Sequence, residues 1–314
     1  MPIMRRFAGR ATLRALFIAS ALTLAVGGAA LIAGRAEAQS GVASDALFRD
    51  GRISVEVSGQ GPDVILIPGY GSSREVWRPL AQRLSATHRV HLVQLAGFAG
   101  EPWTHGDGAL LTPAVEAVAG YIETRGLRKP AVIGHSMGGL SALLLAQTRP
   151  DLVGRIMSVD SLPFFSALFG PTATVESARP FAAQAASQML TGDDAGLRAA
   201  QIAGAPGLSK DPAMQTAMVA WVMASDRQAL ATGIAEVMTT DARPGLSTMK
   251  VPVWAVYAAD ADGGAPAAMA DAMWSQQWAG VPDLRLERVD GSRHFIMADQ
   301  PDVLFALVDR FLED

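Results

Sequence analysis

Apolar runs alternate along the chain with stretches of helical periodicity. The four residues from Val64 to Ile67 are continuously apolar, which is typical of a strand covered on both faces. Similar runs predict further strands at 90–95, 131–133, 156–159, 251–257 and 284–289, and the period-two alternation of 53–57 predicts a half-exposed antiparallel strand. Helices are predicted at 74–85, 113–125, 137–148 and 302–312. This order predicts βαβ units, and therefore an α/β fold with a mostly parallel sheet and helices on both faces.

The pattern changes between the strand that ends near Asp160 and the strand that starts at Val251. This segment has no strand character and is rich in alanine and methionine. Five of its prolines are expected to cut it into short helices; they are Pro163, Pro171, Pro180, Pro206 and Pro212. A helical insertion at the carboxyl end of a parallel sheet lies over the place where such sheets bind ligands. We therefore expect 163–248 to be a helical cap between two core segments, 39–162 and 249–314.

The cap contains many large apolar side chains, and most of them are expected to form its own core. We expect three of them, Phe164, Phe165 and Trp221, to face a substrate pocket. Their apolar character favours a hydrophobic substrate.

The first 38 residues have the three-part layout of a secretory signal peptide. Arginines at 5, 6, 10 and 14 precede an apolar run at 15–33, and Ala36-Glu37-Ala38 supplies small residues at the two positions that a signal peptidase reads. We predict cleavage after Ala38 and a periplasmic or secreted protein. The alternative is a retained membrane anchor, since about 19 apolar residues can just span a bilayer. The pair Arg5-Arg6 leaves twin-arginine export open beside the general route.

Composition narrows the range of functions. Of 314 residues, half are hydrophobic and 18% are charged, so a large core is available, and the net charge of −4 comes with no basic patch interleaved with aromatic residues. Nucleic-acid binding is therefore not expected. The chain has no cysteine, which excludes a thiol nucleophile, cysteine-ligated metals, disulfides and a lipoprotein anchor. It also has no His-Glu-x-x-His motif and no phosphate-binding glycine pattern, so we expect neither a metal nor another cofactor.

The stretch from Ala131 to Leu140 carries the clearest chemistry. An apolar strand ends at Gly134, and an apolar helix begins at Met137 with no polar spacer. Only a very sharp turn can join the two, with Ser136 at its apex in a strained conformation. Glycines at 134 and 138 remove side chains that would collide there. The serine oxygen then projects from a helix amino terminus, which predicts a nucleophile.

With a strand before this turn and a helix after it, the chain from about residue 45 resembles the α/β-hydrolase superfamily. The stretch Leu66-Ile67-Pro68-Gly69-Tyr70-Gly71-Ser72-Ser73 is similar to the family's oxyanion loop, with Pro68 where the family usually has histidine. The resemblance implies an eight-stranded sheet and an oxyanion hole made by the backbone amides of Tyr70 and Met137. It also implies that the base is His294, which follows the last strand and precedes a helix opened by Pro301-Asp302.

The acid of the triad has three candidates. Most relatives place it after the seventh strand, where this chain has Asp260 and Asp262, but the glycine that usually precedes it is missing. Some α/β-hydrolases place it after the sixth strand instead, where this chain has Asp160. An aspartate that ends a buried strand at the active-site edge indicates a role in the site, because a carboxylate that served only to be solvated would have no use at this position. These considerations slightly favour Asp160, and the choice among the three aspartates stays open.

A serine at the turn predicts acyl transfer to water on a small to medium hydrophobic carboxylic ester or lactone. Two alternatives remain: an enzyme of the same fold that cleaves a carbon–carbon, thioester or amide bond, and a non-catalytic binding protein of this fold. The expected partner is a small ester-like molecule, with no nucleic acid and no stable membrane partner after signal cleavage. The sequence leaves the oligomeric state open.

Overall fold

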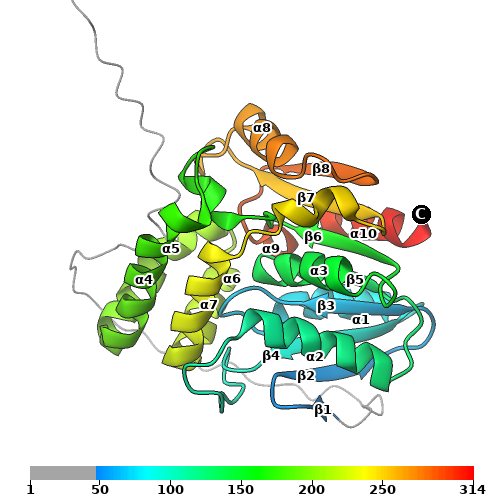
Figure 1. The fold of residues 1–314 in the computed structure, drawn as a ribbon, viewed down its shortest axis with the longest axis horizontal. Helices are drawn as coiled ribbons and strands as arrows, with labels where there is room; N and C mark the ends of the chain where they lie inside the picture. The colour runs from blue at the N-terminus through cyan, green and yellow to red at the C-terminus, as the bar shows by residue number, and fades with distance from the viewer. Residues whose placement is uncertain (1–46) are drawn as a thin grey trace, which may run out of the picture.

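The computed structural model describes residues 47–314, so the predicted signal peptide and its cleavage site lie outside the described residues. The described chain forms one eight-stranded sheet in the order β1-β2-β4-β3-β5-β6-β7-β8 (Figure 1). The strands are β1 (Phe48–Arg49), β2 (Ile53–Ser58), β3 (Asp63–Ile67), β4 (Arg89–Leu95), β5 (Ala131–His135), β6 (Arg155–Val159), β7 (Val253–Ala259) and β8 (Leu284–Asp290). Strands β1 and β2 are antiparallel to their neighbours, and all other pairs are parallel. The predicted α/β fold is confirmed.

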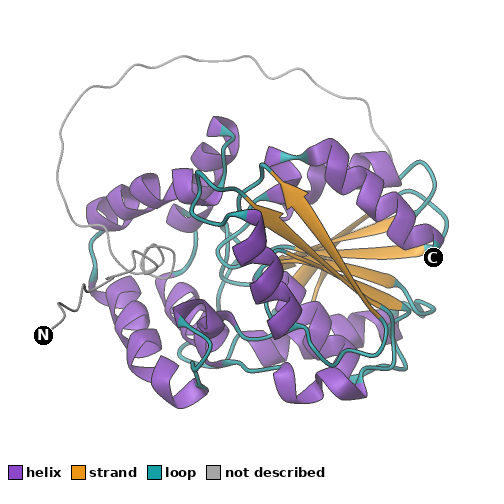
Figure 2. Ribbon diagram, turned by 90° about the horizontal axis from the view of Figure 1, so that it is seen from above, coloured by secondary structure: helices purple, strands orange, loops and turns teal. Residues whose placement is uncertain are grey.

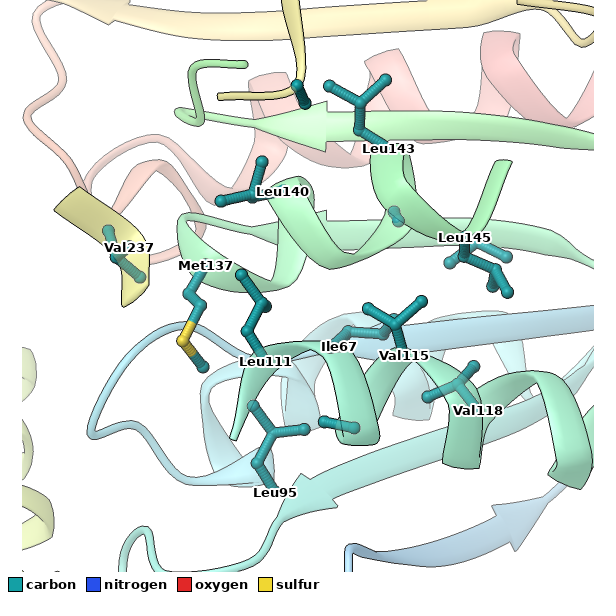
Figure 3. Packing of buried hydrophobic residues seen from close by; sticks show 14 of the residues in the cluster. Ile67, Leu95, Leu111, Val115, Val118, Met137, Leu140, Leu143, Leu145 and Val237 are labelled. Atoms are coloured by element: carbon teal, nitrogen blue, oxygen red, sulfur yellow. The ribbon is translucent and has the colours of Figure 1, made fainter. Parts of the chain in front are cut away.

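Alternate residues of the central strands enter two separate cores, which explains their continuous apolar runs. In β3, Ile65 and Ile67 belong to one core, while Val64 and Leu66 belong to the other. The first core is covered by α2 (Leu111–Thr124), α3 (Met137–Thr148) and α8 (Ala267–Gln277), and the second by η2 (Arg74–Trp77), α1 (Arg78–Leu84), α9 (Ile296–Asp299) and α10 (Pro301–Glu313). Figure 2 shows helices on both sides of the twisted sheet. Figure 3 shows part of the first core, where Met137 and Leu140 of α3 pack near Leu111 of α2.

The residues between β6 and β7 fold into helices, as predicted. They form η3 (Phe165–Phe169), α4 (Val175–Thr191), α5 (Asp194–Leu208), α6 (Pro212–Met223), α7 (Arg227–Thr239) and η4 (Arg243–Thr248), and we call them the insertion. The four α-helices gather at one side of the molecule in both Figures 1 and 2. Helix α4 packs mainly on α7, and α5 packs on α6. Across residues 47–314, none of the helices combines the length and apolar character needed to cross a membrane.

Two of the five prolines that were expected to break helices in the insertion do not do so, which corrects the sequence-based expectation. Pro180 lies inside α4 and Pro206 inside the last turn of α5. Proline removes a backbone donor and costs roughly 3 kcal/mol in a helix interior. Helix α4 tolerates this because its buried face, which includes Ala178, Ala182 and Ala185, is packed. Pro212, by contrast, occupies the first turn of α6, where no donor is lost.

Candidate active site

The turn between β5 and α3 has the sharpness that the sequence predicted. Ser136 has φ 53° and ψ −123°, a conformation that an L-residue rarely adopts. A Cβ atom on Gly134 would lie 2.0 Å from the carbonyl oxygen of Gly138, so only glycine fits there. Ser136 is half-buried and stands at the amino end of α3. Its side chain is therefore held at a helix amino terminus, where the dipole favours a developing negative charge.

The loop after β3 lies directly against this turn. A Cβ on Gly69 would come within 3.0 Å of the Ser136 Cβ, and a Cβ on Gly138 would lie 2.3 Å from the carbonyl oxygen of Ile67. The two backbone segments that carry the amides of Tyr70 and Met137 are thus in contact. Met137 is the first residue of α3, and the first amides of a helix have no intrahelical acceptor. Its side chain is fully buried in the core.

His294 lies in the loop between β8 and α9 and is joined to Asp160. The His294 Nδ1 donates to Asp160 Oδ2 over 2.7 Å. The two side chains are 23% and 12% exposed, so the pair is largely withdrawn from water but reachable from one side. Because Nδ1 carries the proton in this bond, Nε2 is left to accept one.

Asp160 is held by β7 as well as by His294. Its backbone leaves β6 with φ 44°, its amide donates to the carbonyl of Val256 over 2.7 Å, and its Oδ1 accepts from the amide of Ala258 over 3.0 Å. Aspartate tolerates this left-handed conformation better than most residues. One carboxylate oxygen is therefore fixed to the sheet while the other faces the imidazole.

The other two candidate acids are placed differently. Asp260 follows β7 and is only 7% exposed, but its Oδ2 accepts from Arg293 Nε over 2.9 Å, and its Oδ1 lies 3.6 Å from Lys210 Nζ. Although burial alone would raise the pKa of Asp260, Arg293 and Lys210 hold it below its ordinary value. Asp262 is exposed in the following turn. The structure brings Asp160, rather than either of these, to His294.

His135 is buried beneath the turn and touches the loop of His294. Its Nε2 donates to the His294 carbonyl over 3.0 Å, and the two rings lie 4.4 Å apart between centroids. Burial, with a smaller contribution from His294, holds the pKa of His135 well below its ordinary value. His135 is therefore neutral near pH 7 and does not oppose a positive charge on His294.

Tyr70 links the loop after β3 to the insertion. Its hydroxyl donates to the carbonyl of Leu230 in α7 over 2.9 Å, and its ring packs edge-on against Phe98 with centroids 5.4 Å apart. Burial raises the pKa of the Tyr70 phenol, so the phenol stays protonated. Its hydroxyl is therefore a donor to the insertion, while the loop that contains Tyr70 lies against the turn of Ser136.

The three residues expected at a substrate pocket have different surroundings. Phe164 is fully buried, with Ala167 and Ala178 around it and the Arg243 guanidinium 4.5 Å from the centre of its ring. Phe165 and Trp221 are half-buried, the first against the core of α2 and α3 and the second against the other core. A pocket role for these residues stays a prediction.

Several residues that support the site carry no signal in the sequence. Gln94 in β4 accepts from the amide of Arg74 over 2.7 Å and donates to the carbonyl of Ser72 over 3.1 Å, which fixes the loop that contains Tyr70. Asp299 and Asp260 both accept hydrogen bonds from Arg293, the residue before His294. These contacts join distant segments, so local pattern does not predict them. Within residues 47–314, no group of three or more histidine, aspartate or glutamate side chains is arranged to hold a metal ion.

Comparison with known proteins gives a consistent picture. The model of the "Alpha/beta hydrolase family" matches residues 64–307. A pimeloyl-[acyl-carrier protein] methyl ester esterase of Aliivibrio salmonicida is 30% identical over 203 residues, which cover 64% of this chain and 75% of that protein. The protein of the same name from Aeromonas salmonicida is 39% identical over 115 residues, so this chain spans only 44% of its length.

Solved structures share the fold at low identity. The enol-lactonase from Burkholderia xenovorans LB400 superposes with a TM-score of 0.68 at 20% identity, over 83% of this chain and 96% of that one. A thermophilic esterase from Thermogutta terrifontis gives a TM-score of 0.69 at 18% identity, over 83% and 93% of the two chains. At these identities the likeness concerns the fold alone.

Proposed function

This chain belongs to the alpha/beta hydrolase family and is an ester hydrolase, and we propose that it works through a triad of Ser136, His294 and Asp160. The observation that carries the proposal is the 2.7 Å hydrogen bond between His294 Nδ1 and Asp160 Oδ2, in a loop that also accepts a hydrogen bond from the residue before Ser136. A buried carboxylate on Nδ1 selects the tautomer in which Nε2 can take a proton.

The first half of the proposed reaction forms an acyl-enzyme. Ser136 Oγ attacks the ester carbonyl and its proton passes to His294 Nε2, while Asp160 stabilises the imidazolium. The oxyanion that forms accepts hydrogen bonds from the amides of Tyr70 and Met137. The tetrahedral intermediate then collapses, the bond to the alkoxy group breaks, and His294 returns its proton to the leaving alcohol.

The second half restores the enzyme. His294 takes a proton from water, whose oxygen attacks the acyl carbonyl through the same oxyanion site. Collapse of this intermediate releases the carboxylic acid and returns the proton to Ser136. No cofactor enters the sequence of steps, and the acid and the alcohol together contain the atoms of the ester and one water.

We propose a free, small to medium hydrophobic ester or lactone as substrate. The proposal is supported by the methyl ester esterase activity in the name of the Aliivibrio relative and by the apolar insertion at the carboxyl end of the sheet. In this proposal the insertion acts as a cap over the strand ends. Phe165 and Trp221, which are half-buried, are the pocket residues that it offers most directly. We further propose export, on the pattern of the first 38 residues.

A fluorophosphonate probe tests the nucleophile directly. We expect the folded protein to be labelled on Ser136 and to lose its turnover of p-nitrophenyl butyrate in proportion to the labelling. The variant Ser136→Ala should take no label and should lose catalysis by about a factor of 10⁴ or more, because the acyl-enzyme cannot form.

Ser161→Ala is a matched control. Ser161 is a fully buried serine one residue after Asp160, and its hydroxyl forms no hydrogen bond within residues 47–314. This variant should keep both labelling and turnover. Labelling that persists in Ser136→Ala, or turnover that survives complete labelling of the native protein, contradicts the proposed function. A panel of methyl, p-nitrophenyl and lactone substrates then identifies the preferred class.

A further inference from the structure

The loop that carries His294 is bonded on both sides of the histidine to one turn of the insertion. Before it, the Arg293 guanidinium donates from Nη1 to the carbonyl of Pro206. After it, the amide of Phe295 donates to the carbonyl of Leu208 over 3.0 Å. Pro206 and Leu208 belong to the end of α5, next to the turn that leads into α6. The residues on either side of the proposed base are thus hydrogen-bonded to the insertion, while His294 itself is bonded to His135 and Asp160 at the ends of β5 and β6.

Two carboxylates tie the same pair of segments together. Asp299 Oδ2 accepts from the amide of Arg293 over 2.8 Å, and its Oδ1 accepts from Ser209 Oγ over 2.6 Å and from the amide of Lys210 over 2.8 Å. Asp260 binds the Arg293 side chain and faces the Lys210 ammonium. Each carboxylate therefore contacts Arg293 on one side and the turn after α5 on the other, Asp299 through Ser209 and Lys210 and Asp260 through Lys210. We call Asp260 and Asp299 the two latch carboxylates.

The rest of the insertion is joined to the core elsewhere. In α7, Glu236 accepts from the amide of Leu111 over 2.6 Å at the start of α2, and the amide of Asp226 donates to the carbonyl of Gly97 over 2.8 Å. These contacts lie at the start of α2 and in the loop after β4, and neither segment carries His294. The α5–α6 turn is the part of the insertion that holds the histidine loop.

We propose that the latch carboxylates Asp299 and Asp260 are positioning residues for His294, through which the α5–α6 turn of the insertion sets the place of the imidazole. The proposal rests on the triad proposed above. Asp160 fixes the Nδ1 end of the ring, and His135 fixes the His294 carbonyl and packs on the ring of Phe295, but neither forms a hydrogen bond with Arg293 or Phe295. The latch supplies that restraint, so the base is in position only while the insertion is docked.

Of the two latch carboxylates, Asp299 allows the clearer test, because all its partners are hydrogen-bond donors. Asparagine at this position keeps the shape of the side chain, but one of its two polar groups is an NH2, which cannot accept a hydrogen bond. Asp299→Asn therefore loses its hydrogen bonds either to the histidine loop or to the insertion turn. Ser209→Ala removes the bond from Ser209 Oγ to Asp299 and the bond that Ser209 Oγ accepts from the amide of Asp211 within the turn, and it leaves the carboxylate in place. It is the milder variant if Asp299→Asn folds poorly.

Glu236→Gln is the matched control. Glu236 also accepts backbone hydrogen bonds across the boundary between insertion and core, but at the start of α2, away from His294. The measurements are kcat and KM for p-nitrophenyl butyrate, with the melting temperature of each variant. We expect kcat to fall about tenfold to a hundredfold in Asp299→Asn with KM within about threefold, since a misplaced group costs rate more than binding. Ser209→Ala should lose kcat by a smaller factor, and Glu236→Gln should keep it.

The pair of latch variants gives a second readout. If both act on one contact, the double variant Asp299→Asn with Ser209→Ala should lose little more kcat than Asp299→Asn alone. An equal fall of kcat in Asp299→Asn and Glu236→Gln at an equal loss of melting temperature overturns the latch, and so does unchanged kcat in both latch variants. Either result leaves the triad standing as long as Ser136→Ala is inactive and unlabelled. Turnover that persists in Ser136→Ala instead overturns the proposed function itself.

Discussion

At the scale of single residues, the reach of Asp160 depends on how its backbone leaves β6. The left-handed φ of 44° turns the side chain out of the sheet, and the bond from the Ala258 amide holds one oxygen so that the other faces His294. Asp260 stands one strand further along, at the end of β7, and its charge is neutralised by Arg293 and Lys210. Two aspartates that follow neighbouring strands of the sheet thus have different partners.

This difference predicts different kinetics for the two asparagine variants. Asp160→Asn should lower kcat by about 10²–10⁴, because the asparagine NH2 favours the wrong imidazole tautomer. Asp260→Asn keeps the bond between Asp160 and His294 and loosens only the latch, so its loss should be at least about tenfold smaller. Steady-state turnover of p-nitrophenyl butyrate by the two purified variants measures both. Equal losses, or a larger loss in Asp260→Asn, would remove Asp160 from the triad.

The sequence anticipated part of this residue-scale picture. It predicted that Ser136 stands at a strained turn, because an apolar strand and an apolar helix with glycines between them leave no other connection. It left three candidate acids, because the choice depends on which strand end lies beside the last loop, and that is a tertiary contact between residues 134 positions apart. The partners of Asp260 were hidden for the same reason, since Arg293 and Lys210 come from two distant segments.

At the scale of elements, the first turn of α3 must lie against the loop after β3. A Cβ on Gly138 would lie 2.3 Å from the Ile67 carbonyl oxygen and 2.6 Å from that of Pro68, and both are backbone atoms that cannot rotate away. The close approach brings the loop of Tyr70 to the turn of Ser136. The proposed oxyanion site therefore depends on a glycine.

Gly138→Ala is expected to disturb this contact, and Gly120→Ala is its control. Alanine favours a helix by about 1 kcal/mol over glycine, but overpacking costs typically about 1–3 kcal/mol, so Gly138→Ala should lower both the free energy of unfolding and kcat. A Cβ on Gly120, in α2, meets no atom within 4 Å, so that variant should be at least as stable as the native protein. Urea unfolding and turnover compare the two. Full activity and undiminished stability in Gly138→Ala would show that the contact is not tight.

Elements were predicted best where one segment is covered on both faces. The seven predicted strands correspond to β2–β8 within two residues at each end, because strands buried on both sides have to be continuously apolar. The two-residue strand β1 and the helix α8 were not predicted: the first is too short to show alternation, and the apolar residues of α8 give no clear stripe. At Pro180 the sequence predicted a helix break that the structure does not have, since packing of α4 on α7 outweighs the local cost of proline.

At the scale of the whole molecule, the sheet collects segments that are far apart in the chain. Ser136 follows β5, Asp160 follows β6, Tyr70 follows β3 and His294 follows β8, and the carboxyl ends of these parallel strands lie along one edge. The insertion begins at that edge, after β6, and the chain re-enters the sheet at the opposite edge, where β7 starts beside the start of β6. This topology explains why the family resemblance could place Ser136 and His294 at one edge of the sheet, while the contacts between insertion and core required the folded structure.

The buried titratable groups of the whole molecule predict how its stability depends on pH. The pKa of His135 in the folded protein lies well below its ordinary value of 6.5, chiefly through burial, so below about pH 6.5 the unfolded chain binds a proton that the folded one does not. Stability should therefore fall as the pH drops through this range. The pKa values of Asp63 and Asp260 are also held low, against the opposing effect of burial, by Arg89 and His91 for Asp63 and by Arg293 and Lys210 for Asp260. Their contribution is present above the ordinary value of 3.8 and is lost as the pH falls below it.

Two stages of acid destabilisation are therefore expected, and variants can separate them. Urea unfolding at a series of pH values should show a first fall in the free energy of unfolding below about pH 6.5 and a steeper one below about pH 4. His135→Gln should reduce the first stage, even if the variant is less stable throughout, because glutamine does not titrate. His105→Gln is the control, since His105 lies half-exposed in a loop. Asp260→Asn should reduce the second stage alone. If the free energy of unfolding of His135→Gln falls between pH 6.5 and pH 5 as steeply as that of the native protein, His135 is not the neutral histidine that the packing around Ser136 requires. The imidazolium of His294 would then have a second positive charge beside it.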